Sequence, residues 1–316
     1  MLRSKSQLIY LITIIFIIVS ICMQVRFQRK TNKLIGRLEN TIGRLENTIY
    51  AIKADCLSDK LGPLNEKIVE NLKVYTAYDE NGPLELVRHG REYDGGYVTA
   101  TAALKKADVL LGYGINDDNS FEDQFSLTYN KPSYGFDCGI SKIDSRSELF
   151  KFVPQCIASD TFLNNNAKTN NNVTSFNQQV SQLNLADKKL FIKMDIEGAE
   201  YDAFTEILNY SNNITGIVLE IHFDNVSKTQ KALNLLEKLN KDFVLIHVHG
   251  NNCCVKQGFT TLNARGIIPP VIELSYINKA LTTNFVLSGN QKHPTSLDQP
   301  NIKGTPEASF EIIDPK

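Results

Sequence analysis

Three carboxylates follow a short apolar segment near the middle of the chain. Leu190–Met194 has the composition of a buried strand, and Asp195, Glu197 and Glu200 come directly after it. Gly198 permits a tight turn, after which the apolar spacing becomes that of a helix. Because open α/β sheets bind their ligands beyond the carboxyl ends of the strands, these carboxylates are candidates for binding or catalysis.

A glycine-containing turn follows another predicted strand, Val109–Tyr113. Gly112 and Gly114 would let the backbone approach a ligand closely, and Asp118 precedes a predicted helix. An acidic residue at that position more often caps the helix, so the turn alone is a weak signal. Asp137 closes the next strand, 23 residues after Gly114, near the spacing of the carboxylate that holds ribose hydroxyls in nucleotide-binding folds. A solvated loop carboxylate is the alternative for Asp137.

Three of the five histidines lie near the carboxyl ends of two further predicted strands. His222 ends one of them, and His247 and His249 share one face of the other, since side chains alternate along a strand. Such histidines can act as a general base or bind a metal, although a single buried histidine is more often a hydrogen-bonded core residue. Nothing in the spacing requires a metal ion. Ligands for one could come from Asp195, Glu220, His222 and His249.

Strand-like and helical segments alternate around these residues. We predict strands at Val109–Tyr113, Ser133–Asp137, Phe152–Ala158, Leu190–Met194, Gly216–His222, Phe243–His249 and Val271–Tyr276. We predict helices at Phe121–Tyr129, Ser145–Phe150, Ala199–Tyr210 and Lys228–Asn240. This alternation indicates an α/β protein with a parallel, doubly wound sheet. The last two strands lack a clear connecting helix, so an antiparallel pair is expected at one edge.

Seven segments, in this order, resemble the FkbM-type family of S-adenosylmethionine-dependent methyltransferases. They are Arg88–Val98, Leu110–Glu122, Tyr134–Gly139, Phe191–Phe204, Val218–Phe223, His247–Asn252 and Ile268–Lys279. The resemblance covers roughly Leu86 to Lys279, and the glycine turn here reads GYG rather than GxGxG. It implies a Rossmann-like class I methyltransferase fold, with a seven-stranded, mostly parallel sheet whose last strand is antiparallel. It also implies O-methylation of a sugar or another hydroxylated small molecule, with S-adenosyl-L-methionine as cofactor.

The resemblance also suggests roles for individual residues. The expected cofactor-binding set is Gly112, Gly114, Asp118, Asp137, Asp195 and Glu197, with the glycine turn at the methionine part and Asp137 at the ribose. The expected catalytic set is His222 as the first choice of general base, His249 as the second, and Asp195 facing cofactor and acceptor. Asp94, Gly95 and Gly96 either line the same cleft or form an ordinary surface turn.

The N-terminal region predicts a membrane tether. Leu8–Val25 is an apolar run of about 18 residues with basic residues on both sides, and no small-x-small cleavage site follows it. We therefore expect an uncleaved signal anchor within residues 1–30 and a single-pass membrane protein. Residues 31–60 contain a direct repeat, Ile35–Thr41 and Ile42–Thr48, with the apolar spacing of a coiled coil. This stalk would form either a homodimer or a monomeric helix.

The side of the membrane is left open. Basic residues after the apolar run favour a cytoplasmic C-terminal domain. Four Asn-x-Ser/Thr sites, at Asn172, Asn209, Asn213 and Asn225, are no more than chance gives in a chain so rich in these residue types. The six cysteines form no CxxC pair, and buried free thiols are the favoured interpretation.

The remaining boundaries follow from composition. Asp55–Pro63 should break the stalk helix, and the catalytic domain is expected over residues 65–288. Residues 289–316 are proline-rich with little apolar periodicity, which predicts a loosely ordered tail. A net charge of −1 gives no reason to expect a nucleic-acid partner.

Two other functions compete with an active methyltransferase. One is a non-catalytic binding or scaffold protein that keeps the fold. The other is a membrane-anchored glycosyltransferase, which should carry a DxD motif on a loop. Asp195-Ile196-Glu197 imitates that motif poorly, because the chain continues directly into a predicted helix.

Overall fold

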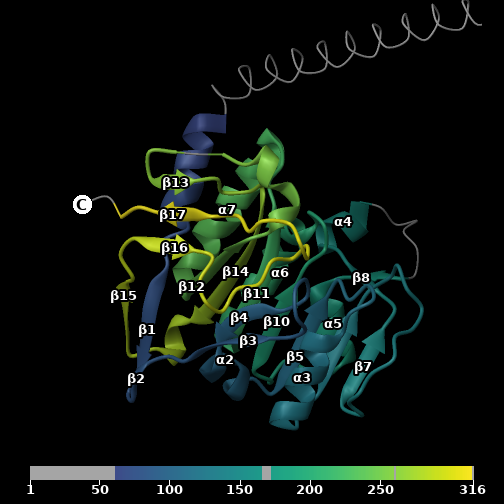
Figure 1. Ribbon diagram of the computed structural model, residues 1–316. Coiled ribbons are helices and arrows are strands. Elements are labelled where there is room, and N and C mark those ends of the chain that lie inside the picture. Colours follow the sequence, from purple (N-terminus) through teal and green to yellow (C-terminus); the bar gives the residue numbers. More distant parts are fainter. Residues whose placement is uncertain (1–60, 166–171, 260, 315–316) are drawn as a thin grey trace, which may run out of the picture. The chain divides into compact units, whose positions relative to one another are not determined.

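The computed structural model describes residues 61–165, 172–259 and 261–314 (Figure 1). The predicted anchor in residues 1–30 and the predicted stalk in residues 31–60 therefore lie outside the described residues. Within the described ranges, no helix combines the length and the apolar character that crossing a membrane requires. Residues 61–71 are helical, with Gly62 and Pro63 in the first turn, and the rest of the predicted break, residues 55–60, lies outside the described residues.

A seven-stranded sheet forms the centre of the described domain (Figure 1). Its strand order is β12-β14-β11-β10-β5-β6-β7. The bounds are β12 Phe243–Gly250, β14 Val271–Asn278, β11 Ile214–His222, β10 Leu190–Met194, β5 Val109–Tyr113, β6 Ser133–Phe136 and β7 Phe150–Val153. Neighbouring strands are parallel except at β14, which is antiparallel to both β11 and β12. The predicted Rossmann-like sheet with an antiparallel last strand is confirmed.

Both faces of this sheet are covered. Alternation along β10 puts Ile192 and Met194 in one apolar cluster and Phe191 in the other. The first cluster includes side chains of the helix over residues 61–71, α5 (Phe176–Gln182), α6 (Glu200–Ile207) and α7 (Val226–Asp242). The second includes α2 (Thr101–Lys106), α3 (Ser120–Tyr129) and the hairpin β3 (Leu86–His89) with β4 (Tyr97–Ala100). A sheet covered on both faces leaves its strand ends as the place for polar chemistry.

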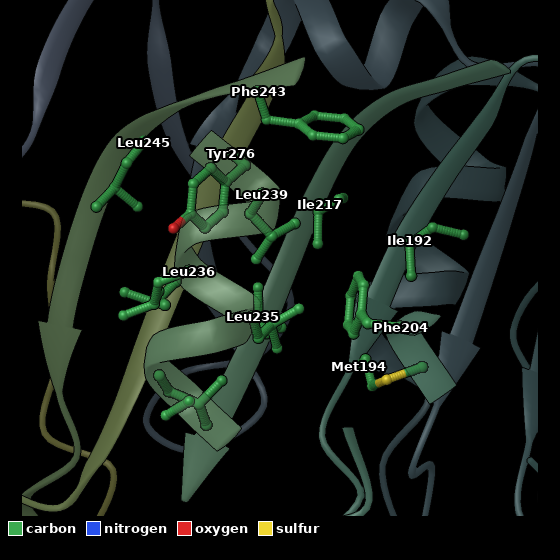
Figure 2. Close-up of a cluster of buried hydrophobic side chains, with 14 of the residues drawn as sticks. Ile192, Met194, Phe204, Ile217, Leu235, Leu236, Leu239, Phe243, Leu245 and Tyr276 are labelled. Atoms are coloured by element: carbon green, nitrogen blue, oxygen red, sulfur yellow. The ribbon is translucent and has the colours of Figure 1, made fainter. Parts of the chain in front are cut away.

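Leucines of α7 fix one of these layers (Figure 2). Leu235, Leu236 and Leu239 recur at helical spacing, are at most 4% exposed and belong to the same cluster as Ile217 of β11. Truncating one such leucine to alanine typically costs about 2–5 kcal/mol of stability. The same packing therefore holds β11 against α7.

Smaller elements surround the central sheet. Two three-stranded sheets combine β15 (Asn284–Leu287), β1 (Tyr75–Asp79) and β2 (Gly82–Pro83), and β13 (Ala264–Gly266), β17 (Phe310–Ile312) and β16 (Gln291–His293). A short pair joins β8 (Cys156–Ile157) and β9 (Val173–Thr174), and α4 spans Asp160–Asn165. The described part of the chain also contains the short 3₁₀ segments η1 (Leu208–Asn213), η2 (Asn252–Gln257) and η3 (Lys279–Leu281).

The C-terminal segment corrects the prediction of a loosely ordered tail. Residues 289–314 return to the domain as β16 and β17, and Ala308, Phe310 and Ile312 are at most 5% exposed. The side chains of Asp298 and Glu307 contact histidines of β12. Its prolines and its lack of apolar periodicity were a misleading signal, because this segment is held by polar contacts as well as by burial.

Two local predictions are also wrong. Ser145–Phe150 is not helical, since Ser145 and Ser147 accept backbone N–H groups on their side chains and Phe150 already begins β7. Cys138 and Cys156 form a disulfide rather than buried free thiols. Residues distant in sequence meet there, which local composition does not reveal.

Candidate functional site

The chain reverses its direction of travel across the sheet at β5 and β10. From β5 it continues outward through β6 and β7, whereas β10 and β11 lie on the other side of β5. Such a switch point leaves a crevice at the carboxyl ends of the two central strands, where open α/β sheets bind ligands. A cavity of ≈ 410 Å³ lies there, lined by residues that follow β5, β6 and β10. Its volume falls in the usual range for small-molecule sites.

The glycine turn after β5 forms part of the cavity wall. Gly114 has φ +77°, and a Cβ on it would overlap the carbonyl oxygen of Asp195. Glycine therefore lets this turn lie directly against the end of β10. Gly112 does not line the cavity, because it packs against the fully buried Glu122. Of the two predicted glycines, only Gly114 is placed where it could contact a cofactor.

Asp137 lies at the cavity wall, directly after β6. Its Oδ2 accepts the Asn116 N–H at 2.8 Å and its Oδ1 accepts the Gly139 N–H at 2.6 Å. These two bonds fix the carboxylate, and each oxygen keeps further lone pairs for a ligand hydroxyl. The geometry is compatible with the predicted ribose role.

Asp118 has a structural task although it also lines the cavity. It accepts the Ser120 N–H at 3.0 Å and lies 3.2 Å from the guanidinium of Arg91. That ion pair ties the loop before β4 to the turn after β5. Asp94 and Gly95 of the same loop line the cavity, so this segment is more than a surface turn, whereas Gly96 packs against Arg88 away from it.

Asp195 lines the cavity directly after β10. Tyr97 donates its hydroxyl to Asp195 Oδ2 at 3.4 Å, while Oδ1 is buried and receives no hydrogen bond from the described residues. Burial first, and then the neighbouring Glu220, raise the pKa of Asp195 well above its ordinary value, against the opposing charge of Lys193. A carboxylate with a raised pKa is a stronger base once it is ionised.

Two residues of the cavity wall were not predicted from the sequence as candidate functional residues. Tyr97 and Lys193 both line the cavity, and the Lys193 ammonium lies 5.8 Å from the centre of the Tyr97 ring. Lys193 carried a readable signal, because a charged residue interrupts an apolar strand two positions before Asp195 and so shares its face. Tyr97 carried none, since its place depends on how the hairpin β3–β4 packs on the sheet.

Glu197 and His222 lie beside the cavity rather than at its centre. Glu197 lines the wall with its side chain 86% exposed, and His222 Nε2 is 3.3 Å from Glu197 Oε2 and 3.3 Å from Glu220 Oε1. His222 Nδ1 is 3.4 Å from Glu200 Oε1. Burial lowers the pKa of His222, but Glu200 and Glu220 raise it to about 10 in balance. The ring is thus protonated near neutral pH, and Asp195 is better placed than His222 to accept a proton.

The other predicted histidines lie away from the cavity lining. His249 Nδ1 is 3.0 Å from Glu273 Oε2 and its Nε2 is 3.3 Å from Glu307 Oε2, so both ring nitrogens are occupied. His247 Nε2 is 2.7 Å from Asp298 Oδ1. Because Glu273 and the tail residue Glu307 occupy its two ring nitrogens, His249 has a structural role in this geometry, and its selection as second base gains no support.

Asp195 begins a row of polar side chains across four strands. Glu220 pairs with Glu273 in the register of β11 and β14, and Glu273 pairs with His249 in that of β14 and β12. Asn251 donates to Glu220 at 2.9 Å. The structure thus brings Asp195, Glu220 and His222 together, while His249 closes the far end of the row.

The Cys138–Cys156 disulfide borders the same cavity. Cys138 directly follows Asp137, and Cys156 contributes to the cavity wall. The covalent link therefore restrains the loop that carries the Asp137 carboxylate.

Comparison with known proteins adds little to this geometry. No protein-family model and no curated protein matches the chain. A solved structure from Streptococcus mutans, assigned as a SAM-dependent methyltransferase, shares 10% identity over 55% of this chain with a TM-score of 0.28. This chain spans 46% of that protein. A protein of Shewanella sp. PV-4 assigned to riboflavin biosynthesis shares 13% identity over 56% of this chain and 77% of its own, with a TM-score of 0.22. Likenesses this slight carry no argument, so the site is judged on its own residues.

Proposed function

We propose that the described domain binds S-adenosylmethionine in the cavity and is an O-methyltransferase acting on a hydroxylated small molecule, such as a sugar. One observation carries this proposal. The ≈ 410 Å³ cavity lies at the β5/β10 switch point and has Asp137 fixed at the end of the next strand, where a ribose would lie.

The charge of the cavity supports a cationic ligand. Six carboxylates line it, against the two cations Arg91 and Lys193. The carboxylates are Asp94, Asp117, Asp118, Asp137, Asp195 and Glu197. Such a wall suits a sulfonium and repels the phosphates of a sugar nucleotide, which disfavours a glycosyltransferase.

The chemistry assigned to the chain is positioning and proton transfer. The bound cofactor would supply an electrophilic methyl group on its sulfonium. Asp137 would hold the ribose hydroxyls, and Gly114 would allow close backbone approach. Asp195 would orient the acceptor hydroxyl and take its proton as the oxygen attacks, while the Tyr97 hydroxyl keeps the carboxylate in place.

Calorimetric titration with S-adenosylmethionine tests the proposal. The wild-type protein should bind it, and Asp137→Ala should weaken binding by at least about tenfold because ribose hydrogen bonds are lost. Asp117→Ala is the matched control, since that carboxylate also lines the cavity but is not part of the assigned ribose site. Absence of binding by the wild type would favour the non-catalytic scaffold, and equal losses in both variants would refute the ribose assignment.

We further propose that residues 8–25 tether the enzyme to a membrane. The Cys138–Cys156 disulfide supports placing the domain on the oxidising side, because disulfides persist mainly in such compartments. In sealed vesicles the domain should then resist added protease until detergent is present. Digestion of intact vesicles would place it on the cytoplasmic side instead.

A further inference from the structure

The ends of β10 and β11 bring two acids and one histidine of the described domain unusually close together. One carboxylate oxygen each of Asp195 and Glu220 and one ring nitrogen of His222 all lie within 4.8 Å of one another. Glu220 is 4% exposed and the His222 side chain is 12% exposed. These residues come from neighbouring strands that are held in register by the sheet, so their proximity does not depend on a flexible loop.

This cluster is poor in positive charge. Four carboxylates lie around the His222 ring: those of Asp195, Glu197, Glu200 and Glu220. Burial raises the pKa of both Asp195 and Glu220. Repulsion from Glu220 adds to the rise for Asp195, and repulsion from Glu273 adds to it for Glu220. Buried carboxylates in such surroundings are costly unless a cation is close by.

Two buried atoms of the cluster also lack hydrogen bonds. Asp195 Oδ1 and His222 Nδ1 find no hydrogen-bond partner among the described residues, although the latter lies near Glu200. Buried polar groups are normally hydrogen-bonded, so an unpaired carboxylate oxygen beside a histidine has lone pairs free for a ligand. By contrast, Glu220 Oε2 is already held by Asn251, as an oriented metal ligand commonly is.

We propose that Asp195, Glu220 and His222 bind a divalent cation of the Mn²⁺ or Zn²⁺ class. Two carboxylates with one imidazole suit these metals, and ligand atoms around one such ion lie roughly 3–4.3 Å apart at bonds of about 2.1 Å. The candidate ligand atoms, within 4.8 Å of one another, lie close to that spacing. The bound cation would take over the charge compensation that His222 provides alone.

The place of this site gives the cation a role, which rests on the proposed function. Asp195 is shared between the cluster and the cavity wall, so the cation lies where an acceptor would enter. A cation there would bind the acceptor hydroxyl and lower its pKa, assisting proton loss to Asp195. Acceptors with two adjacent hydroxyls would be favoured, because both oxygens can reach one ion.

Mn²⁺ binding to the full-length protein tests the proposal directly. Calorimetry should find one Mn²⁺ per chain, and pulsed electron paramagnetic resonance should detect a coordinated histidine nitrogen. Mn²⁺ is the probe of choice because it avoids the free thiols of Cys253 and Cys254, which would compete for Zn²⁺. Glu220→Gln should weaken binding by at least about tenfold, and His222→Gln should also abolish the nitrogen signal.

Asp224→Asn is the matched control. Asp224 lies just beyond the same strand end, exposed and paired with Lys228, and its replacement should leave Mn²⁺ affinity unchanged within about twofold. Thermal unfolding of each variant would exclude misfolding. No Mn²⁺ binding by the wild type, or equal binding by Glu220→Gln and wild type, would overturn the site. Titration of S-adenosylmethionine on the same samples separates this result from the proposed function, since Mn²⁺ binding without cofactor binding would leave the metal site standing alone.

Discussion

The two ends of the polar row across the sheet differ in whether another segment covers them. At the β10 end, Asp195 faces a cavity and one of its oxygens has no hydrogen bond within the described domain. At the β12 end, the ring nitrogens of His249 each meet a carboxylate, one of which is supplied by the returning C-terminal segment. Similar residue types at strand ends thus serve binding where they are left open and stability where a second segment covers them.

That difference predicts which property, stability or ligand binding, each substitution should change. Changes at the covered end should lower stability with little direct effect on ligand binding, and changes at the open end should affect ligand binding. The following predictions test this division, from the largest expected effect to the smallest.

Phe310→Ala should be the most damaging change at the covered end. Phe310 is 4% exposed and stacks on His293 with ring centres 4.8 Å apart, so its loss should cost about 3–5 kcal/mol of unfolding free energy. Chemical denaturation measures this. Phe285→Ala, at a phenylalanine that is 38% exposed, should cost less than half as much. Similar small effects for both would restore the interpretation of a loosely ordered tail.

Removing the disulfide should affect the open end in two ways. Cys138→Ser with Cys156→Ser releases a cross-link between residues 18 apart, which should cost roughly 3 kcal/mol of stability. It should also weaken S-adenosylmethionine binding, because Asp137 lies on the freed loop. Denaturation and calorimetry, each with Cys253→Ser as the control at a free, exposed cysteine, would measure both. Unchanged affinity would mean that backbone contacts alone hold Asp137.

Gly114→Ala should act mainly on cofactor binding. A methyl group there would collide with the Asp195 carbonyl and push the glycine turn from β10, so affinity should fall about 100-fold, equivalent to about 2.7 kcal/mol. Gly289→Ala is a close control, because its φ of +73° matches the +77° of Gly114 but no atom crowds its Cβ. If the two variants bound the cofactor alike, the turn would not contact it.

Glu307→Gln should have the smallest and most specific effect. Burial lowers the pKa of His249, but Glu273 and Glu307, with Asp298 nearby, raise it to about 10. A histidine pKa raised on folding stabilises the protein fully below about pH 6.5, and this contribution is lost as pH rises through 10. The variant should therefore be about 1 kcal/mol less stable at pH 6, with the difference shrinking towards pH 10.

Glu311→Gln is the control for that pH dependence. Glu311 is similarly buried in the same segment but lies 3.8 Å from Arg265, which stays charged throughout this range. Glu311→Gln should lower stability by an amount that does not change between pH 6 and pH 10. If the stability of the two variants depended on pH in the same way, the pH dependence could not be attributed to His249.

Much of the central sheet could be predicted from the sequence. β5 and β10 lie at the predicted residues, and the acidic turn after β10 does line the cavity. Apolar runs that end in acids or glycines are local signals, and parallel strands must align their carboxyl ends. The placement of Gly114, Asp137 and Asp195 at one wall follows from these two facts.

Only the tertiary structure decided the roles of the histidines and cysteines. Glu273 and Glu307 select a structural role for His249, yet they lie 24 and 58 residues away from it in sequence. Tyr97 reaches Asp195 across 98 residues, and the disulfide joins two segments in which the sequence predicts free thiols. Periodicity and motif spacing report what each segment prefers by itself. Packing between segments decides which side chains are covered, which are paired and which stay accessible to a ligand. The burial and the charge of each side chain depend on its neighbours from other segments.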